Sequence, residues 1–296
     1  MTLQFRKLHP LFAAEAGGVD LRRVHDSETL ERIRAGMDEH AVLVFRDQAL
    51  SSADQLAFAT RLDGGGLHRK TGISVLAKSR FGDEALTDVS NVGADGEVLD
   101  ADDRKRQYGI ANRLWHTDAS FQDPRGRYSM LAALVLPPVA SDTEFADMRA
   151  AYDALADETK ASLEGLRVHH SIAYSRVTLG FEFSEEESDR LKGAIQPLVL
   201  KNPRTGRRSL YLASHASRIL DRPVPDGRLL LRDLMEHATG PGHVYRHSWQ
   251  SGDFLIWDNR ATMHRARPFD DTQHRREMRR VTTLDTGDPA RIAQAV

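Results

Sequence analysis

The chain has 296 residues, a formal net charge of −2 and no cysteine. The small net charge gives no reason to expect nucleic acid as a partner, and the lack of cysteine excludes disulfides and thiolate metal sites. No N-terminal leader pattern and no membrane span of roughly 20 apolar residues is evident, so we expect no membrane partner. We therefore expect a single cytoplasmic domain over residues 1–296, able to bury its own core, with a homo-oligomer left open.

The first hundred residues predict two helices, a buried strand and a long loop. An N-cap and apolar residues at helical spacing predict a helix over residues 26–37, and a short apolar run predicts a strand over residues 41–45. A capping box at residues 52–55 opens a second helix, which the glycines at 64–66 end. A loop over about 63–103 follows. Loops of this length are usually lids, binding segments or connections, and an ordinary surface loop is the alternative.

The rest of the chain predicts a helical insert followed by short strands. The insert covers about residues 146–240. Short strands on both sides of a helical insert favour a mainly β fold with flanking helices, of the double-sheet jelly-roll type found in cupins. The elements expected in this part are helices at 148–155, 159–163 and 229–238, an extended segment at 166–170, and strands at 244–249, 254–257 and 278–283.

Two histidines and one aspartate are the candidate metal ligands. His116 and Asp118 form a His-x-Asp motif, and an extended segment places both side chains on one face. His264, far downstream, completes a facial triad that leaves three coordination positions open and suits non-haem Fe(II) oxygen chemistry. The motif alone also arises by chance in a chain with 13 histidines. Zinc accepts the same donors, so a zinc hydrolase or a metal-bound structural protein is an alternative.

An arginine-rich strand over residues 275–280 supplies the cation that such an oxygenase needs. Dioxygen chemistry at Fe(II) draws two electrons from a cosubstrate, and 2-oxoglutarate provides them while its distal carboxylate is held elsewhere. Arginine binds a carboxylate through two parallel hydrogen bonds and keeps its charge. On a strand, Arg276 and Arg280 share one face, whereas Arg275 and Arg279 share the other. A basic, solvent-facing strand is the alternative and still accounts for the second pair.

With these motifs in place, the chain resembles the Fe(II)/2-oxoglutarate dioxygenases of the taurine dioxygenase family, and within it the members that act on phenoxyacetates. The His-x-Asp, Trp-Asp-Asn-Arg-x-x-x-His and Arg-Arg-x-x-Arg-Arg motifs occur in the family's order and approximate spacing. The likeness is dense over residues 127–131 and 142–155 and covers nearly the whole chain. It implies a double-stranded β-helix core with flanking helices.

The resemblance also implies a role for each motif residue. The three residues of the triad would bind iron. Arg276 would bind the distal carboxylate of 2-oxoglutarate, and Thr143 would share this task, although an ordinary strand residue is the alternative for Thr143. Arg280 would face the acidic group of the substrate. Arg279 is its rival, because a bulge in the strand would exchange the two faces.

Fewer residues are implied for the aryl part of a substrate. Asn112, Lys70 and His215 are the candidates by resemblance. Two departures from the family pattern concern this side of the site. Arg218 stands where a close relative has a second histidine, and Leu-Asp-Gly at residues 62–64 stands where the family more often has Phe-Gly.

The expected reaction uses Fe(II), 2-oxoglutarate and O2 on a small aryl carboxylate. Hydroxylation of the carbon next to the ether oxygen of a phenoxyacetate, such as 2,4-dichlorophenoxyacetate, gives a hemiacetal that collapses to a phenol and glyoxylate. Succinate and CO2 are the products of the cosubstrate. A sulfonate or alkyl sulfate substrate is the alternative within the family, since Arg280 would hold either anion.

Overall fold

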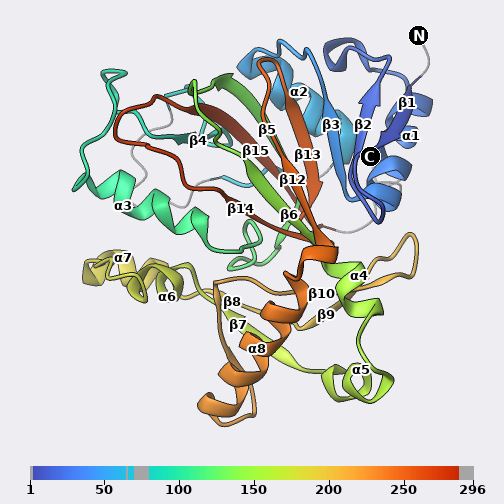
Figure 1. Cartoon of the computed structure of the whole chain (residues 1–296), viewed down its shortest axis with the longest axis vertical. Coiled ribbons are helices and arrows are strands. Elements are labelled where there is room, and N and C mark those ends of the chain that lie inside the picture. The colour runs from blue at the N-terminus through green and yellow to red at the C-terminus, as the bar shows by residue number, and fades with distance from the viewer. Residues whose placement is uncertain (1–2, 65, 70–79, 287–296) are drawn as a thin grey trace.

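Two layers of strands form one body of the molecule, and a lobe of helices and short strands lies below them (Figure 1). The computed structural model describes residues 3–64, 66–69 and 80–286. The larger layer is a seven-stranded sheet of order β1-β2-β3-β13-β5-β15-β4, and the smaller layer is a sheet of order β12-β6-β14. The strands of the larger sheet are β1 (Gln4–Lys7), β2 (Ala14–Gly17), β3 (Val42–Phe45), β4 (Thr87–Ser90), β5 (Gly126–Val135), β13 (Phe254–Asp258) and β15 (Glu277–Leu284). The strands of the smaller sheet are β6 (Thr143–Asp147), β12 (Val244–His247) and β14 (Thr262–Ala266).

Strand β3 shows how the larger sheet is buried on both faces. All four of its residues are buried, as the continuous apolar run predicted. Val42 and Val44 face the smaller sheet, where they belong to the same core cluster as Phe145 of β6. Leu43 and Phe45 face the other way, into the core beneath the N-terminal helices. The mainly β fold with flanking helices is therefore confirmed.

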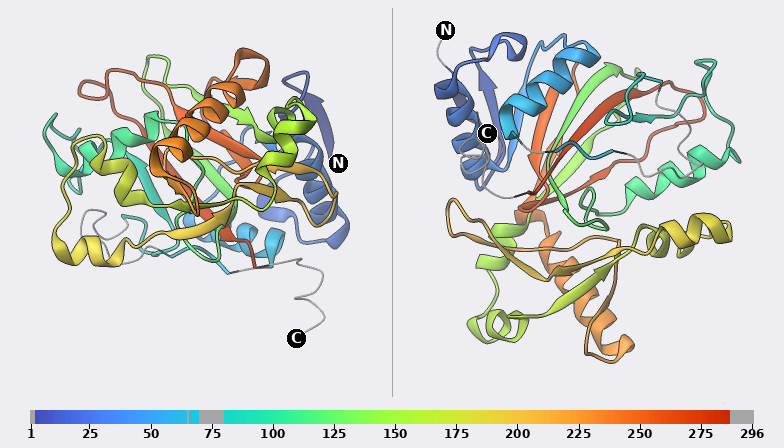
Figure 2. Two further views of the ribbon diagram at one scale, coloured as in Figure 1. Left: turned by 90° about the horizontal axis from the view of Figure 1, so that it is seen from below. Right: turned by 180° about the vertical axis from the view of Figure 1, so that it is seen from behind.

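Two helices, α1 (Ser27–His40) and α2 (Ser52–Asp63), cover the outer face of the larger sheet (Figures 1 and 2). Asp26 caps α1 by accepting a hydrogen bond from the backbone of Thr29 at 2.7 Å. The capping box of α2 joins Ser51 and Asp54, one residue earlier than the sequence suggested. Gln55 is consequently free to be buried against the sheet.

The segment between β6 and β12 forms the lower lobe, and it is less helical than predicted. Its helices pack on two small sheets, of order β11-β7-β8 and β10-β9. Helix α8 begins at Val224, five residues before the predicted start. The helices are α4 (Met148–Asp153), α5 (Asp157–Leu163), α6 (Ile172–Val177), α7 (Glu185–Arg190) and α8 (Val224–Ala238), and the strands are β7 (Arg167–His170), β8 (Ala194–Pro197), β9 (Val199–Lys201), β10 (Arg208–Leu210) and β11 (Ala216–Ile219).

The expected loop over 63–103 contains an edge strand. Strand β4 pairs antiparallel with β15, with Thr87 opposite Arg280 and Ser90 opposite Glu277. Helix α3 (Arg104–Ile110) follows and lies beside this edge (Figure 1). In the described parts of the chain, no helix is both long and apolar enough to span a bilayer.

Candidate active site

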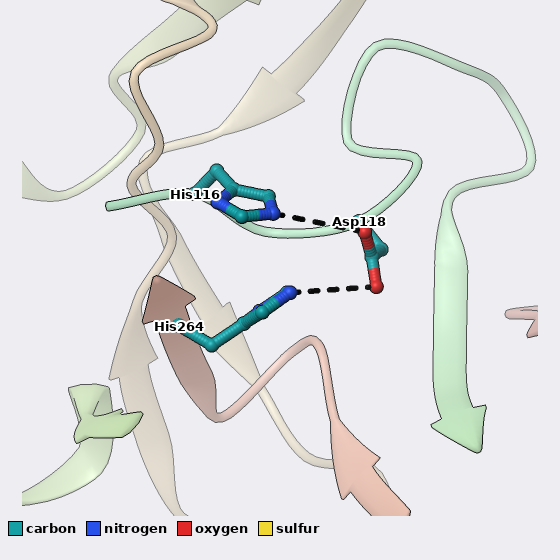
Figure 3. A group of neighbouring side chains, drawn as sticks. All are labelled: His116, Asp118 and His264. Carbon is teal, nitrogen blue, oxygen red and sulfur yellow. Dashed lines mark ion pairs between the residues drawn. The ribbon is translucent and has the colours of Figure 1, made fainter. Parts of the chain in front are cut away.

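His116, Asp118 and His264 converge at one point between the two sheets (Figure 3). His264 lies in β14, whereas His116 precedes β5 on a segment outside the named strands. The two backbones are nevertheless joined as in a strand pair, since each histidine N–H donates to the other's carbonyl, at 3.0 and 2.8 Å. The Nε2 atoms of His116 and His264 lie 4.0 and 3.7 Å from the Asp118 carboxylate oxygens.

Hydrogen bonds orient two of these side chains. His116 Nδ1 lies 2.8 Å from the Leu114 carbonyl, so Nδ1 carries the proton and donates it to this carbonyl. The lone pair of Nε2 is then left to bind a metal ion. Asp118 accepts a hydrogen bond from Ser129 Oγ at 2.7 Å, and its backbone N–H donates to Asn259 Oδ1 at 3.1 Å. These contacts fix the carboxylate between the two rings.

Burial sets the protonation states of the triad. It lowers the pKa of His116 to about 4 and holds the pKa of His264 well below its ordinary value. Burial is the largest single influence on Asp118 and acts to raise its pKa, but the charge of Arg280, the two histidines and the Ser129 hydrogen bond together outweigh it, so the pKa of Asp118 stays below its ordinary value. Two neutral imidazoles and an ionised carboxylate are the forms that bind a divalent metal, so the donor set fits Fe(II).

The triad lies in the wall of a cavity of about 470 Å³. Arg276 and Arg280 line the same cavity, together with Asn112 and His215. Much of the remaining wall consists of the apolar or aromatic side chains of Tyr108, Ile110, Phe121, Ile172 and Phe269.

Arg276 is buried without a carboxylate partner among the described residues. Its side chain is 8 % exposed, and its Nε has no hydrogen-bond partner in that part of the chain. Burial lowers its pKa to about 10. The Trp249 ring centre lies 6.0 Å from the guanidinium carbon. Arg276 is therefore available to an anion that enters the cavity.

Thr143 contacts Trp249 and is absent from the described cavity lining. Its hydroxyl accepts a hydrogen bond from Trp249 Nε1 at 3.0 Å. The contact to the cosubstrate that the resemblance implied for Thr143 stays a prediction. What the structure adds is the Trp249 indole, which contacts both this hydroxyl and the Arg276 guanidinium and was not predicted from the sequence.

Arg280 and Arg279 lie on opposite faces of β15, as predicted. Arg280 forms an ion pair with Asp118 inside the cavity. Arg279 points to helix α2, where it donates to Gln55 Oε1 at 2.7 Å and to the Leu50 carbonyl at 2.6 Å. The bulges of β15 do not exchange the faces at these two positions, and Arg279 is not among the described residues that line the cavity.

Two of the three residues expected on the substrate side line the cavity. Asn112 does so next to Arg176, and His215 lies with its ring centre 5.2 Å from that of Phe121. Lys70 lies outside the described residues. Arg218, the departure from the family pattern, is exposed on β11.

Sequence reasoning missed Arg176 of α6. This side chain is 4 % exposed and lines the cavity. It follows a serine in an unremarkable segment, Ala-Tyr-Ser-Arg-Val, so its burial had no signal in the sequence.

Comparison with known proteins agrees with this geometry. The model of the family described as "Taurine catabolism dioxygenase TauD, TfdA family" matches residues 4–282. The chain is 45% identical over 288 residues to the alpha-ketoglutarate-dependent 2,4-dichlorophenoxyacetate dioxygenase of Burkholderia sp. (strain RASC), covering 96% of this chain and 95% of that one. It is 46% identical over 289 residues to the protein of the same name from Cupriavidus pinatubonensis, covering 96% and 99%.

A solved structure is similar over almost the whole length. AAD-2 in complex with Mn(II) and N-oxalylglycine superposes with a TM-score of 0.87 at 44% identity, covering 98% of this chain and 99% of that one. The match of the family model and the identity to full-length relatives lead to one conclusion. The chain belongs to the TauD/TfdA dioxygenase family.

Proposed function

We propose that this protein is an Fe(II)- and 2-oxoglutarate-dependent dioxygenase that hydroxylates the carbon next to the ether oxygen of phenoxyacetate-type acids such as 2,4-dichlorophenoxyacetate. One observation carries the proposal. A buried triad of two neutral imidazoles and a carboxylate shares a cavity with Arg276, a buried cation that has no carboxylate partner among the described residues. The first feature fits the metal, and the second fits an anionic cosubstrate.

His116, Asp118 and His264 would hold the iron. When bound, Fe(II) supplies the dioxygen chemistry that breaks an unactivated C–H bond, at the expense of 2-oxoglutarate. The protein's own part is to present two unprotonated Nε2 atoms and one ionised carboxylate without rearrangement. The hydrogen bonds of Leu114 and Ser129 keep the His116 ring and the carboxylate in these positions.

Arg276 would bind the distal carboxylate of 2-oxoglutarate. A guanidinium that is buried and lacks a counter-ion gains more from an entering carboxylate than an exposed one, because its charge has already lost water. The Trp249 indole packs beside it, and Thr143 holds the indole through its hydrogen bond. Thr143 would thus support the cosubstrate site, with or without a direct contact.

The substrate would lie between Arg280 and the aromatic part of the wall. Arg280 supplies a cation for the acid group, and Phe121, Ile172 and Phe269 supply apolar surface for a ring. Asn112, His215 and Lys70 are proposed contacts for the ring and its substituents.

The reaction balances without an acid or base from the protein. Phenoxyacetate, 2-oxoglutarate and O2 give the α-hydroxylated acid, succinate and CO2. The hydroxylated carbon then carries both an ether and a hydroxyl oxygen, and this hemiacetal collapses to a phenol and glyoxylate. The chain's residues are needed to position the α-carbon at the metal.

Two other functions are weaker. A sulfonate or alkyl sulfate would also satisfy Arg280, but neither presents a ring to the aromatic part of the cavity wall. A zinc hydrolase would use the triad, but it gives no reason for a buried Arg276 that lacks a carboxylate partner in the described part of the chain. The partner we propose is a small aryl carboxylate, in a cytoplasmic setting, with the oligomeric state left open.

Succinate release tests the proposal. Purified protein is incubated with Fe(II), 2-oxoglutarate and one of four substrates: phenoxyacetate, phenylacetate, taurine or an alkyl sulfate. We expect iron-dependent succinate and phenol with phenoxyacetate. Succinate only with taurine or the alkyl sulfate would replace the substrate class, and no 2-oxoglutarate consumption with any of them would contradict the reaction class.

A further inference from the structure

Arg176 is a second cation of the cavity that has no carboxylate partner among the described residues. It comes from helix α6 of the lower lobe, whereas Arg280 comes from strand β15 of the larger sheet (Figure 1). Its guanidinium donates to Ser175 Oγ at 2.9 Å and to Asn112 Oδ1 at 3.3 Å. It also lies 4.7 Å from the centre of the Tyr108 ring. Its Nε is buried and has no hydrogen-bond partner within the described chain.

The other cations of the described cavity wall, apart from Arg276, are already paired with carboxylates. Their charges are compensated, and an anionic ligand would have to compete for them. The pairs are Lys105 with Asp88, Arg106 and Arg113 with Asp271, Arg267 with Glu144, and Arg280 with Asp118.

Two anionic groups are thus expected in the cavity beyond the metal ligands. Arg276 accounts for the distal carboxylate of 2-oxoglutarate. Arg176 is also buried, with 4 % exposed against 8 % for Arg276, and burial lowers its pKa below the ordinary value. A buried guanidinium that lacks a counter-ion destabilises the folded protein unless a ligand supplies the missing charge. Two neutral hydrogen bonds and an aromatic ring compensate it only in part.

Arg176 and Arg280 act on the same region of the cavity. Burial raises the pKa of the Tyr108 hydroxyl, and the charges of Arg176 and Arg280 both oppose this rise. Both side chains line the cavity together with His116 and Asp118. The two cations therefore flank a space beside the metal ligands, where the acid group attached to the reacting α-carbon would lie.

We propose that Arg176 binds the carboxylate of the substrate together with Arg280, one guanidinium from the helical lobe and one from the sheet. This inference rests on the proposed function, because it takes the substrate to be an aryloxy acid. Arg280 shares its charge with Asp118, so Arg176 provides the uncompensated charge that selects an anion over a neutral molecule. Asn112 then positions Arg176, since its Oδ1 accepts a hydrogen bond from the guanidinium.

A binding experiment without turnover tests the inference. The protein is loaded with Mn(II) and N-oxalylglycine, an analogue of 2-oxoglutarate that does not decarboxylate. Phenoxyacetate and its neutral analogue phenoxyacetamide are titrated by calorimetry into wild type, Arg176→Met and Arg228→Met. The last variant is a matched control. Arg228 is an exposed arginine of helix α8, and its guanidinium lies 5.3 Å from the ring of Tyr174, which is on the same helix as Arg176. Arg228 does not line the cavity.

We expect Arg176→Met to weaken phenoxyacetate binding by about 10- to 100-fold, the usual contribution of a charged hydrogen bond. Phenoxyacetamide binding should change by less than about two-fold, and Arg228→Met should resemble wild type. An equal loss for acid and amide in Arg176→Met would make the residue a packing element and overturn the inference. An unchanged affinity for the acid would do the same.

The outcome for wild type separates this inference from the proposed function. Wild type that binds neither compound would overturn both. If Arg176→Met does not fold, Arg176→Lys and Arg176→Gln provide the same comparison. Lysine should keep part of the preference for acid over amide, and glutamine should lose it. Equal preferences in these two variants would contradict the role of the charge.

Discussion

Arg280 and Asp118 form an ion pair inside the cavity, so the arginine proposed to bind the substrate also contacts a proposed iron ligand. The carboxylate of Asp118 would thus bind the metal and also pair with Arg280. A change at Arg280 therefore affects the substrate directly and the metal ligand indirectly. Kinetic and metal-binding measurements have to be combined to separate the two effects.

Replacing Arg280 should weaken use of the aryl acid. In Arg280→Ala we expect kcat/KM for phenoxyacetate to fall, with a loss of about 2–5 kcal/mol in transition-state stabilisation. The reason is that the substrate carboxylate would lose the arginine with which it forms an ion pair. The KM for 2-oxoglutarate should change little, and its decarboxylation should continue without formation of phenol. Arg280→Lys should recover only part of the loss, since an ammonium cannot form two parallel hydrogen bonds. Unchanged kinetics for the acid would transfer the role to Arg176 or Lys70.

The triad makes a simpler prediction. Anaerobic addition of Fe(II) and 2-oxoglutarate should give a visible charge-transfer band, and Ala at His116, Asp118 or His264 should abolish both the band and turnover. The exposed His25 provides a matched control, and His25→Ala should keep both signals. Normal activity in His264→Ala would exclude the triad as the metal site.

Arg276 should matter for the cosubstrate and not for the acid. Arg276→Ala should raise the KM for 2-oxoglutarate strongly, by a factor equivalent to a binding free energy on the order of 2–5 kcal/mol, because the distal carboxylate would lose its charged partner. Arg275 is the control, since its side chain is half exposed and pairs with Glu277 outside the cavity lining. A larger effect in Arg275→Ala would mean that the faces of the strand are assigned the wrong way round.

The sequence predicted the parts of the site that depend on short spacing. A two-residue period placed Arg276 and Arg280 in the cavity and Arg279 on the outer face, and this order survives in β15. Contacts between segments far apart in the chain could not be predicted from these local patterns. Strand β4 has four partly buried residues and no clear alternation, so only its pairing with β15 defines it. Arg176 is buried by segments distant in sequence, and no local pattern carries that information.

The capping box of α2 lies one residue before the predicted position, and the reason is similar. Ser51 and Ser52 are adjacent, and both are good N-cap residues, so the sequence alone does not choose between them. Packing decides, because Gln55 donates to the carbonyls of Met130 at 3.0 Å and Arg279 at 3.1 Å on two strands of the sheet. A capping role for Gln55 would remove it from this buried position.

Stability should fall with acid because of His170. Its side chain is fully buried, and burial lowers its pKa to about 3, whereas the unfolded value is about 6.5. The unfolded chain therefore binds the extra proton first, so the stabilisation is complete above pH 6.5 and is lost as the pH falls towards 3. Between pH 6.5 and 5 we expect a loss of about 2 kcal/mol from this residue.

Urea unfolding of the metal-free protein at several pH values measures this effect. Other buried histidines contribute to the total slope, so His170→Gln is compared with wild type, and the difference isolates His170. The exposed His25 is the control, and His25→Gln should leave the slope as it is in wild type. Identical slopes for wild type and His170→Gln would contradict a neutral, buried His170.

The last prediction concerns Ser129, which supports a metal ligand without contacting the cavity. Its hydroxyl donates to Asp118 Oδ2 at 2.7 Å and accepts from Asn259 Nδ2 at 2.9 Å, and both neighbours are fixed by further contacts. In Ser129→Ala the carboxylate keeps its charge but loses an orienting hydrogen bond. We expect the Kd for Mn(II) or Fe(II) to rise by about 10-fold, as for other residues that orient metal ligands, with KM for 2-oxoglutarate nearly constant.

Ser217→Ala is the matched control for this test. Ser217 Oγ also donates one short hydrogen bond, to the His169 carbonyl at 2.9 Å on the neighbouring strand, but it lies outside the site. This variant should lose a similar amount of stability and no metal affinity. If Ser129→Ala binds metal as tightly as Ser217→Ala does, the Asp118 carboxylate is held by Arg280 and the histidines alone, and the Ser129 hydroxyl serves only the packing of β5.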